Sequence, residues 1–178
     1  MRNAVLVVLV SVFVIGCAAP SQPPAESAAP AGPTPKAYSN LAQVMRGIPF
    51  PASNLIFDTQ SNDPAAAKTA EGATATAQFS GVYGGWQAVE NAALTLSETA
   101  NLIMIPGRLC ENGRPVPLDQ EVFRKAAQGL ADAGAAAYKA AVSKNLDAMV
   151  EVSGTVADAC AACHEKYRDK DDNKDRCM

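Results

Sequence analysis

Apolar residues recur at helical spacing in four long segments between residues 39 and 169, and this repeat restricts the fold more than any other feature of the chain. The clearest segment covers residues 73–106. Steps of four and three residues alternate there from Ala75 to Ile103, which is a heptad seam. No segment shows the period of two that is typical of strands. Four amphipathic helices in one short chain predict an all-α, antiparallel, up-down-up-down four-helix bundle.

Two prolines interrupt the first helical segment, residues 39–58. Pro49 and Pro51 each lack an amide donor, so two helical hydrogen bonds are lost. The apolar stripe nevertheless continues in register across both prolines. We therefore expect a kinked helix at this point, not two unrelated elements.

The third and fourth segments have recognisable ends. The third follows Pro117, has Asp119 as a candidate cap and runs to about Val142, with an interior made mostly of alanine. Small side chains of this kind allow a neighbouring helix or a flat ligand to approach closely. The fourth segment begins at Ser143 or Asn145.

The first 16 residues have the features of a secretory signal. Arg2 precedes an apolar run of 13 residues, Ala4–Gly16, which is too short to cross a bilayer of about 30 Å. The run ends in "VIGC", which resembles the lipobox of bacterial lipoproteins. This resemblance implies cleavage before Cys17 and acylation of Cys17. An ordinary signal peptide that happens to end beside a cysteine is the alternative.

Residues 17–38 follow as a tether. Positions 18–38 hold six prolines and seven alanines with few large apolar side chains, so they cannot build a core. At about 3.1 Å per residue, an extended tether would reach roughly 60 Å from the lipid. The folded domain is expected over residues 39–178. The formal net charge of −3 and the absence of a basic cluster argue against a nucleic-acid-binding protein.

The stretch "CAACH", residues 160–164, has the C-x-x-C-H form of c-type haem attachment. On a helix, Cys160 and Cys163 lie on one side, where their thiols can add across the two vinyl groups of a porphyrin. His164 follows immediately and can supply the proximal nitrogen to the iron. It is the only histidine in the sequence.

Three other interpretations of this motif are possible. A zinc site would need a fourth ligand, which Cys110 or Cys177 could supply. A thioredoxin-like redox pair normally lies at a strand-to-helix junction, and the helical pattern disfavours it. A plain buried histidine does not explain the two cysteines before it.

The motif at Cys160–His164, at the end of the fourth helical segment and followed by "EKYR", resembles the class II cytochromes c, the cytochrome c′ type. The resemblance extends over the four segments, residues 39–169. It implies one covalently attached haem c, held between the helices near the C-terminal end of the fourth helix. Pro49 and Pro51 depart from the better-known members of this family.

Bundle topology suggests what lies opposite His164. Met45 comes about six residues after the start of the first helix, and His164 about five before the expected end of the fourth, so both lie about 9 Å from the same end. The resemblance implies a methionine ligand early in the first helix when the iron is six-coordinate. Met45 is therefore the predicted distal ligand, with core packing as its alternative role. Met104 is the second candidate, whereas Met149 is about 22 Å from His164 along the same helix.

Several other residues are placed near this end of the bundle. Arg46 and Arg108 could pair with haem propionates or be solvated, and Tyr167 could pack on the porphyrin. The sequence "DKDDNKDR", residues 169–176, indicates a solvated tail. Cys110 and Cys177 remain after haem and lipid are assigned. An even number of thiols in an oxidising compartment predicts a disulfide between them.

Electron transfer is the predicted function, because His/Met ligation favours a low-spin iron with a raised potential. The alternative is a five-coordinate haem protein that binds nitric oxide or carbon monoxide. A structural zinc lipoprotein is the third hypothesis. No catalytic constellation appears, so an enzyme is not expected. The expected partners are exported redox proteins and a membrane on the periplasmic side of a bacterial cell, the outer one favoured by Ala18. Formation of a homodimer is left open.

Overall fold

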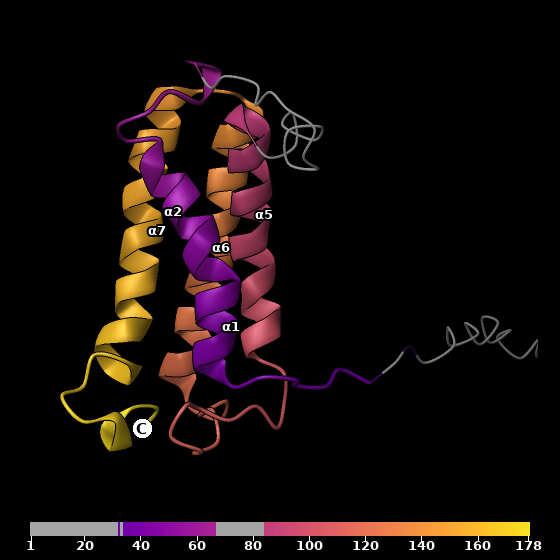
Figure 1. Cartoon of the computed structure of the whole chain (residues 1–178), viewed down its shortest axis with the longest axis vertical. Coiled ribbons are helices and arrows are strands. Elements are labelled where there is room, and N and C mark those ends of the chain that lie inside the picture. The colour runs from indigo at the N-terminus through magenta and orange to yellow at the C-terminus, as the bar shows by residue number, and fades with distance from the viewer. Residues whose placement is uncertain (1–31, 33, 67–83) are drawn as a thin grey trace, which may run out of the picture. The chain divides into compact units, whose positions relative to one another are not determined.

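The computed structural model describes residue 32 and residues 34–66 and 84–178. Its long helices run antiparallel, as Figure 1 shows. They are α1 (Leu41–Gly47), α2 (Pro49–Asp58), α5 (Gly85–Ile103), α6 (Glu121–Val142) and α7 (Leu146–Tyr167). Short 3₁₀ helices, η1 (Pro64–Ala66) and η2 (Asn173–Asp175), follow α2 and α7. Since α1 and α2 form one broken helix, the predicted all-α four-helix bundle is confirmed.

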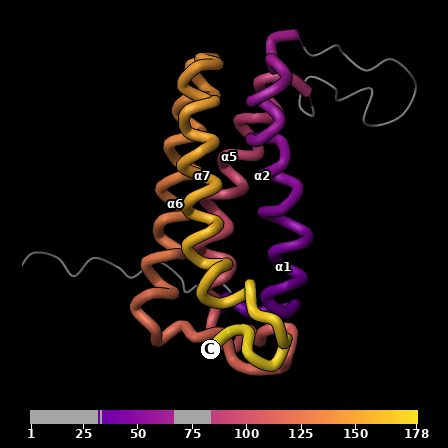
Figure 2. Tube along the Cα trace, turned by 90° about the vertical axis from the view of Figure 1, so that its left-hand side faces the viewer, coloured from indigo at the N-terminus to yellow at the C-terminus, as the bar shows by residue number. Residues whose placement is uncertain are grey.

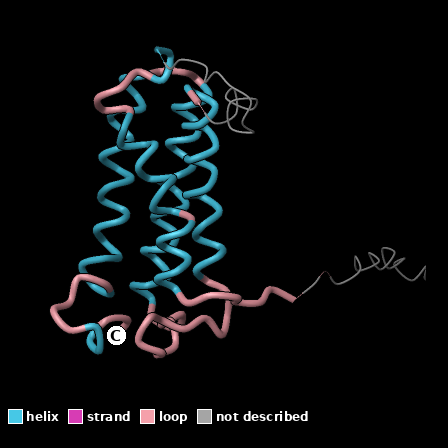
Figure 3. Tube along the Cα trace, in the orientation of Figure 1, coloured by secondary structure: helices cyan, strands magenta, loops and turns pink. Residues whose placement is uncertain are grey.

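Within the described ranges no strand is present, and the only bridge pairs Leu109 with Pro115. Figure 3 shows the same distribution of helix and loop. None of the helices in those ranges has the length and apolar content needed to cross a bilayer. The predicted signal peptide over 1–16, Cys17 and the first three of the nine positions of the predicted heptad seam lie outside the described residues.

The break between α1 and α2 lies at Ile48, next to the first proline. Asn40 caps α1 through a reciprocal pair of hydrogen bonds with Gln43. The Ile48 amide still donates to the Val44 carbonyl at 3.0 Å, but Ile48 itself leaves the helical conformation, with φ −121° and ψ −73°. Pro49 then occupies the first turn of α2, where its missing amide costs little. The predicted kink is therefore confirmed.

The other helix ends differ slightly from the expectations. Asn145 caps α7 by accepting a hydrogen bond from the Ala148 amide, as predicted. The cap of α6 is Gln120, whose side chain makes no capping hydrogen bond, so the prediction of Asp119 was wrong. Pro117 and the loop before it place the start of α6 one residue later than the sequence suggests.

The alanine-rich helices pack closely. The main core joins α2, α5, α6 and α7 around fully buried side chains such as Ile56, Leu96 and Met149. The backbones of α5 and α6 approach closely at Gly134, where a Cβ atom would lie 2.5 Å from the backbone nitrogen of Ser97 on α5. The Ser97 hydroxyl donates to the Ala131 carbonyl at 2.8 Å across the same contact. Small residues therefore set the distance between α5 and α6.

This contact gives a prediction on stability. Gly134→Ala should lower the free energy of unfolding by about 1–3 kcal/mol, because the added methyl group meets backbone that cannot yield without separating α5 from α6. Gly129→Ala, on the same helix with open space at its Cβ, is the control and should raise stability by up to about 1 kcal/mol. Urea unfolding of the two variants measures both effects. Equal changes in the two variants would contradict the close contact.

Candidate haem site

The C-x-x-C-H motif forms the last two turns of α7. Cys160, Cys163 and His164 are all half-buried, and both thiols are free. The helix ends at Tyr167, and the His164 carbonyl accepts hydrogen bonds from the amides of Arg168 and Asp169 at 2.8 and 2.7 Å. The spacing of the motif therefore puts both thiols and the imidazole on one side of one helix, as predicted.

All three side chains line a cavity of about 460 Å³. Its walls come from α1 and α2 on one side and from α6 and α7 on the other, and Figure 2 shows these two pairs of elements facing each other. The lining is mostly apolar, with Leu41, Pro49, Phe50, Ile103, Ala127 and Leu130 among its residues. Phe50 is 62% exposed, so the cavity reaches the surface. An apolar space of this size that holds two thiols and an imidazole fits a flat, apolar macrocycle with an iron at its centre.

Burial governs the protonation of these groups. Burial raises the pKa of the Cys160 thiol, and raises that of Cys163 to about 11, where the neighbouring Cys160 adds to the effect. Burial and then the nearby Arg168 cation lower the pKa of the His164 imidazole. At neutral pH the imidazole is therefore held in its uncharged form, which is the form that binds a metal.

Met45 lines the same cavity from α1. It is the fifth residue of α1, and His164 is the fourth from the end of α7. At 1.5 Å per residue, both lie within about 6 Å of helix ends at the same end of the bundle (Figure 1). The two residues therefore have similar depth, as the sequence suggested, although α7 ends slightly earlier than expected.

The other methionines lie elsewhere in the described structure. Met104 packs against the small clusters around Phe123 and Ile103, and it is not part of the cavity lining. Met149 is fully buried in the main core. Of the candidates named from the sequence, Met45 is thus the one on the cavity wall.

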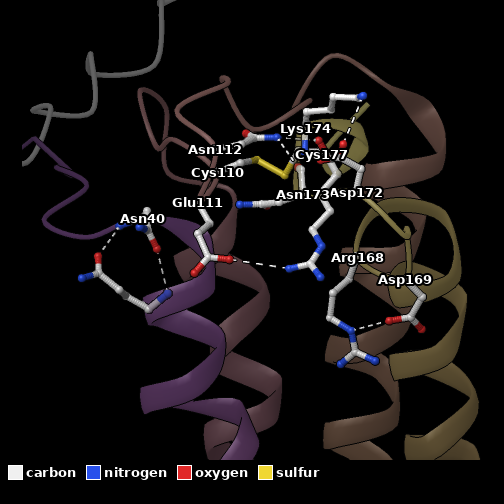
Figure 4. A network of polar contacts seen from close by, with 12 residues as sticks. Asn40, Cys110, Glu111, Asn112, Arg168, Asp169, Asp172, Asn173, Lys174 and Cys177 are labelled. Atoms are coloured by element: carbon white, nitrogen blue, oxygen red, sulfur yellow. Dashed lines mark hydrogen bonds and ion pairs between the residues drawn. A yellow bond between two sulfur atoms is a disulfide. The ribbon is translucent and has the colours of Figure 1, made fainter.

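The tail after α7 folds back against the loop between α5 and α6. Cys110 and Cys177, the pair predicted from the sequence, are joined by a disulfide with a Cα–Cα distance of 6.4 Å. Figure 4 shows this bond beside Asn112. The Asn112 amide nitrogen donates to the carbonyls of Asn173 and Arg176 at 2.9 and 3.1 Å. Residues 169 and 171–174 are exposed, as predicted for a solvated tail, but the tail is fastened at its end, and Asn173 and Arg176 line the cavity.

Removal of this disulfide should weaken the fold. The two cysteines are 67 residues apart in the sequence, and the double substitution Cys110→Ser, Cys177→Ser opens the loop that their bond closes. We expect the free energy of unfolding to fall by about 2–4 kcal/mol. Urea unfolding compares the variant with the parent protein. Peptide mapping without reductant should recover the linked pair. Alkylation of both thiols in native, unreduced protein would contradict the disulfide.

The two arginines proposed for the propionates behave differently. Arg46 lines the cavity, and within the described ranges its guanidinium has no protein partner. Arg108 is only 4% exposed and does not line it. Its terminal nitrogens donate to the carbonyls of Ser39 and Leu102 at 2.7 and 2.8 Å. Arg108 thus fastens the segment before α1 to the end of α5, and it lies neither on the cavity wall nor in solvent, the two places considered from the sequence.

The cavity lining includes three charged residues that sequence reasoning missed. They are Glu111, Arg168 and Arg176. Arg168 bonds to Asp169 at 2.6 Å, and Arg176 pairs with Glu111 at 3.6 Å, both drawn as dashed lines in Figure 4. The disulfide predicted at Cys177 was a usable signal, because it places Arg176 at the end of the bundle where His164 lies.

Tyr167 lines the cavity on the turn after the motif. Its ring meets Phe123 edge-on at 5.3 Å, and its hydroxyl donates to the Gln120 side chain at 2.9 Å. Both contacts are with α6 and its cap, so Tyr167 secures the end of α7 against α6. Packing of this ring on a porphyrin stays a prediction.

The structure does not support the interpretation of the motif as a zinc site. Cys110 and Cys177, the proposed additional ligands, are bonded to each other. Over the described ranges, no group of three or more His, Cys, Asp and Glu side chains gathers closely enough to hold a metal ion. The motif therefore lacks the ligand set that zinc requires.

Comparison with known proteins points in the same direction. Residues 116–168 match the model of the cytochrome c′ family. The matched region contains α6, α7 and the C-x-x-C-H motif. No curated protein and no solved structure matched the chain. The match supports haem c binding, with electron transfer or gas binding as the associated function. Together with the helical bundle, the match over residues 116–168 supports a cytochrome c′-like protein.

Proposed function

We propose that this protein is an exported, lipid-tethered monohaem c-type cytochrome that transfers electrons and is not an enzyme. Cys160 and Cys163 would hold one haem c through thioether bonds, and His164 and Met45 would bind its iron from opposite sides. One observation carries the proposal. The two thiols and the imidazole line the same apolar cavity as a methionine from the first helix.

The residues around the cavity would have distinct roles in electron transfer. When bound, haem c supplies an iron that takes up and releases one electron. The uncharged His164 imidazole and the Met45 thioether are both neutral ligands, which favours a raised reduction potential. His164 and Met45 lie on helices that pack into one bundle. We therefore expect the positions of both side chains to change little between the two oxidation states. Phe50 at the exposed edge marks where the site approaches the surface.

A redox titration of the purified full-length protein tests this function. We expect a reversible one-electron transition with one haem per chain, and low-spin spectra for both oxidation states. A protein that contains haem but is high-spin in the ferrous state would favour the alternative below. A protein purified without haem would contradict both.

The alternative function is binding of nitric oxide or carbon monoxide by a five-coordinate haem, for sensing or detoxification. It is supported by the mostly apolar lining of the cavity, in which Leu41, Pro49 and Ile103 offer no hydrogen-bonding side chain to a bound gas. In this case Met45 would pack beside the iron without binding it. The role of Met45 therefore separates the two functions.

The proposed location is the periplasmic side of a bacterial membrane, with the outer membrane favoured. It is supported by the sequence before residue 39, which combines a signal-like run, Cys17 and a tether rich in proline and alanine. Exported redox proteins are the partners that such a location would provide.

The anchor can be tested by mass spectrometry. We expect the mature N-terminal peptide to begin at Cys17 and to carry the mass of two or three acyl chains, which would hold the protein stably at a membrane. Cys17→Ser should release the protein from the membrane fraction while leaving the haem in place. Unmodified Cys17, or cleavage at another residue, would contradict the anchor.

A further inference from the structure

The charged residues of the cavity wall are Arg46 on α1, Glu111 in the loop between α5 and α6, Arg168 after α7 and Arg176 in the tail. Three of the four are cationic, although the whole chain carries a net charge of −3. A cavity of mostly apolar lining with a cationic border fits a ligand that has an apolar body and an acidic edge.

Among the arginines that line the cavity, Arg176 is the one with an unsatisfied buried donor. Its Nε atom is buried and has no hydrogen-bond partner. Its only ionic contact in the described structure is with Glu111, at 3.6 Å, which is longer than a hydrogen bond. A buried donor without an acceptor is destabilising, and native structures seldom keep one without a reason.

The other two arginines lack this feature. Arg168 donates its Nε to Asp169, and its side chain is 58% exposed, against 39% for Arg176. Arg46 is exposed, so water can satisfy its guanidinium. Of the three arginines on the cavity wall, Arg176 alone therefore has a buried donor without an acceptor, a feature that it shares with Arg108 outside the cavity.

The backbone around Arg176 is fixed in place. Its carbonyl accepts from Asn112, its amide donates to Asn173 at 3.2 Å, and the next residue is the disulfide-bonded Cys177. The Cys177 amide also donates to the Tyr167 carbonyl at 2.9 Å, one turn after the motif. The tail is thus tied both to the loop between α5 and α6 and to the end of α7.

We propose that Arg176 is a carboxylate-binding residue of the haem site, and that the Cys110–Cys177 disulfide positions it to receive a haem propionate. The inference rests on the proposed haem c function. It assigns the C-terminal tail a role in holding the acidic edge of the cofactor, in addition to closing the end of the bundle. A guanidinium presents donors in a planar fork that matches a carboxylate, and its fixed positive charge favours the ionised form.

The pH dependence of the midpoint potential of the holoprotein tests this role. A carboxylate near the iron makes the potential change with pH around its own pKa. Loss of a nearby arginine raises the pKa of a carboxylate by about 1 pH unit or more. We therefore expect Arg176→Gln to move the inflection upward by about 1 unit, and the double substitution Cys110→Ser, Cys177→Ser to move it in the same direction.

Lys174→Gln is the matched control. It removes the same charge from the same tail, but the Lys174 side chain is 72% exposed, pairs with Asp172 and is absent from the cavity wall. The control should leave the inflection nearly unchanged. Arg176→Lys keeps the charge without the forked donors, so its inflection should lie between those of the parent and Arg176→Gln.

The outcomes are separable. If Arg176→Gln and Lys174→Gln shift the inflection by the same amount, or if neither shifts it, the role of Arg176 is overturned. The haem assignment then still stands. A larger shift in Arg46→Gln or Arg168→Gln than in Arg176→Gln would also overturn the role of Arg176. If Arg176→Gln yields no holoprotein, the position of the Arg176→Lys inflection decides. Absence of haem from the parent protein would instead overturn the proposed function.

Discussion

Met45→Ala is expected to convert the iron from low spin to high spin and to open it to carbon monoxide. Met45 lines the cavity from α1, at a depth from the bundle end similar to that of His164. Removal of its thioether would leave one axial position without a protein ligand and should lower the reduction potential. Optical spectra of the ferric and ferrous variant, with and without carbon monoxide, measure these changes. The weak sulfur-to-iron band at the red end of the ferric spectrum should be lost.

Met104→Ala is the control for this experiment. Met104 packs against the clusters around Phe123 and Ile103, outside the cavity lining, so its removal should leave the spectrum nearly unchanged. A Met45→Ala protein with the parent spectrum would show that Met45 is not a ligand. An altered spectrum in Met104→Ala alone would transfer the assignment to that residue.

The second large effect is expected from the thiols. The double substitution Cys160→Ala, Cys163→Ala should abolish covalently bound haem, because these free cysteines are the ones on the cavity wall beside His164. Haem staining after denaturing electrophoresis should be positive for the parent protein and negative for the variant. The intact mass of the parent should exceed that of the polypeptide by one haem.

Substitution of the other thiols provides the comparison. The Cys110→Ser, Cys177→Ser variant lacks only the disulfide and should retain the stain. A parent protein whose haem is extracted completely by acidified acetone would contradict thioether attachment. If only the Cys110→Ser, Cys177→Ser variant loses the stain, attachment through Cys160 and Cys163 is contradicted.

The helices were predictable because each carries its own local signal. The apolar stripe persists across Pro49, so a kinked helix followed from the sequence, and Asn145 is a residue type that favours a helix start. The motif at Cys160–His164 also needs only local spacing on one helix. These features depend on neighbours within a few residues, which the sequence displays directly.

The border of the cavity could not be predicted in the same way. The tail has no apolar period and many charges, and its position depends on distant contacts with Asn112 and Cys110. In the sequence Arg108 looks like an exposed arginine, but it is buried, and its two terminal nitrogens donate to the carbonyls of Ser39 and Leu102. Side-chain roles that depend on long-range contacts therefore required the structure.

Binding of carbon monoxide to the ferrous parent protein tests His164/Met45 ligation in a single experiment. We expect a low-spin ferrous spectrum and slow uptake of carbon monoxide, because the gas would first have to displace the Met45 thioether. A ferrous protein that is already high-spin and binds carbon monoxide at once would contradict His164/Met45 ligation and would favour the gas-binding function.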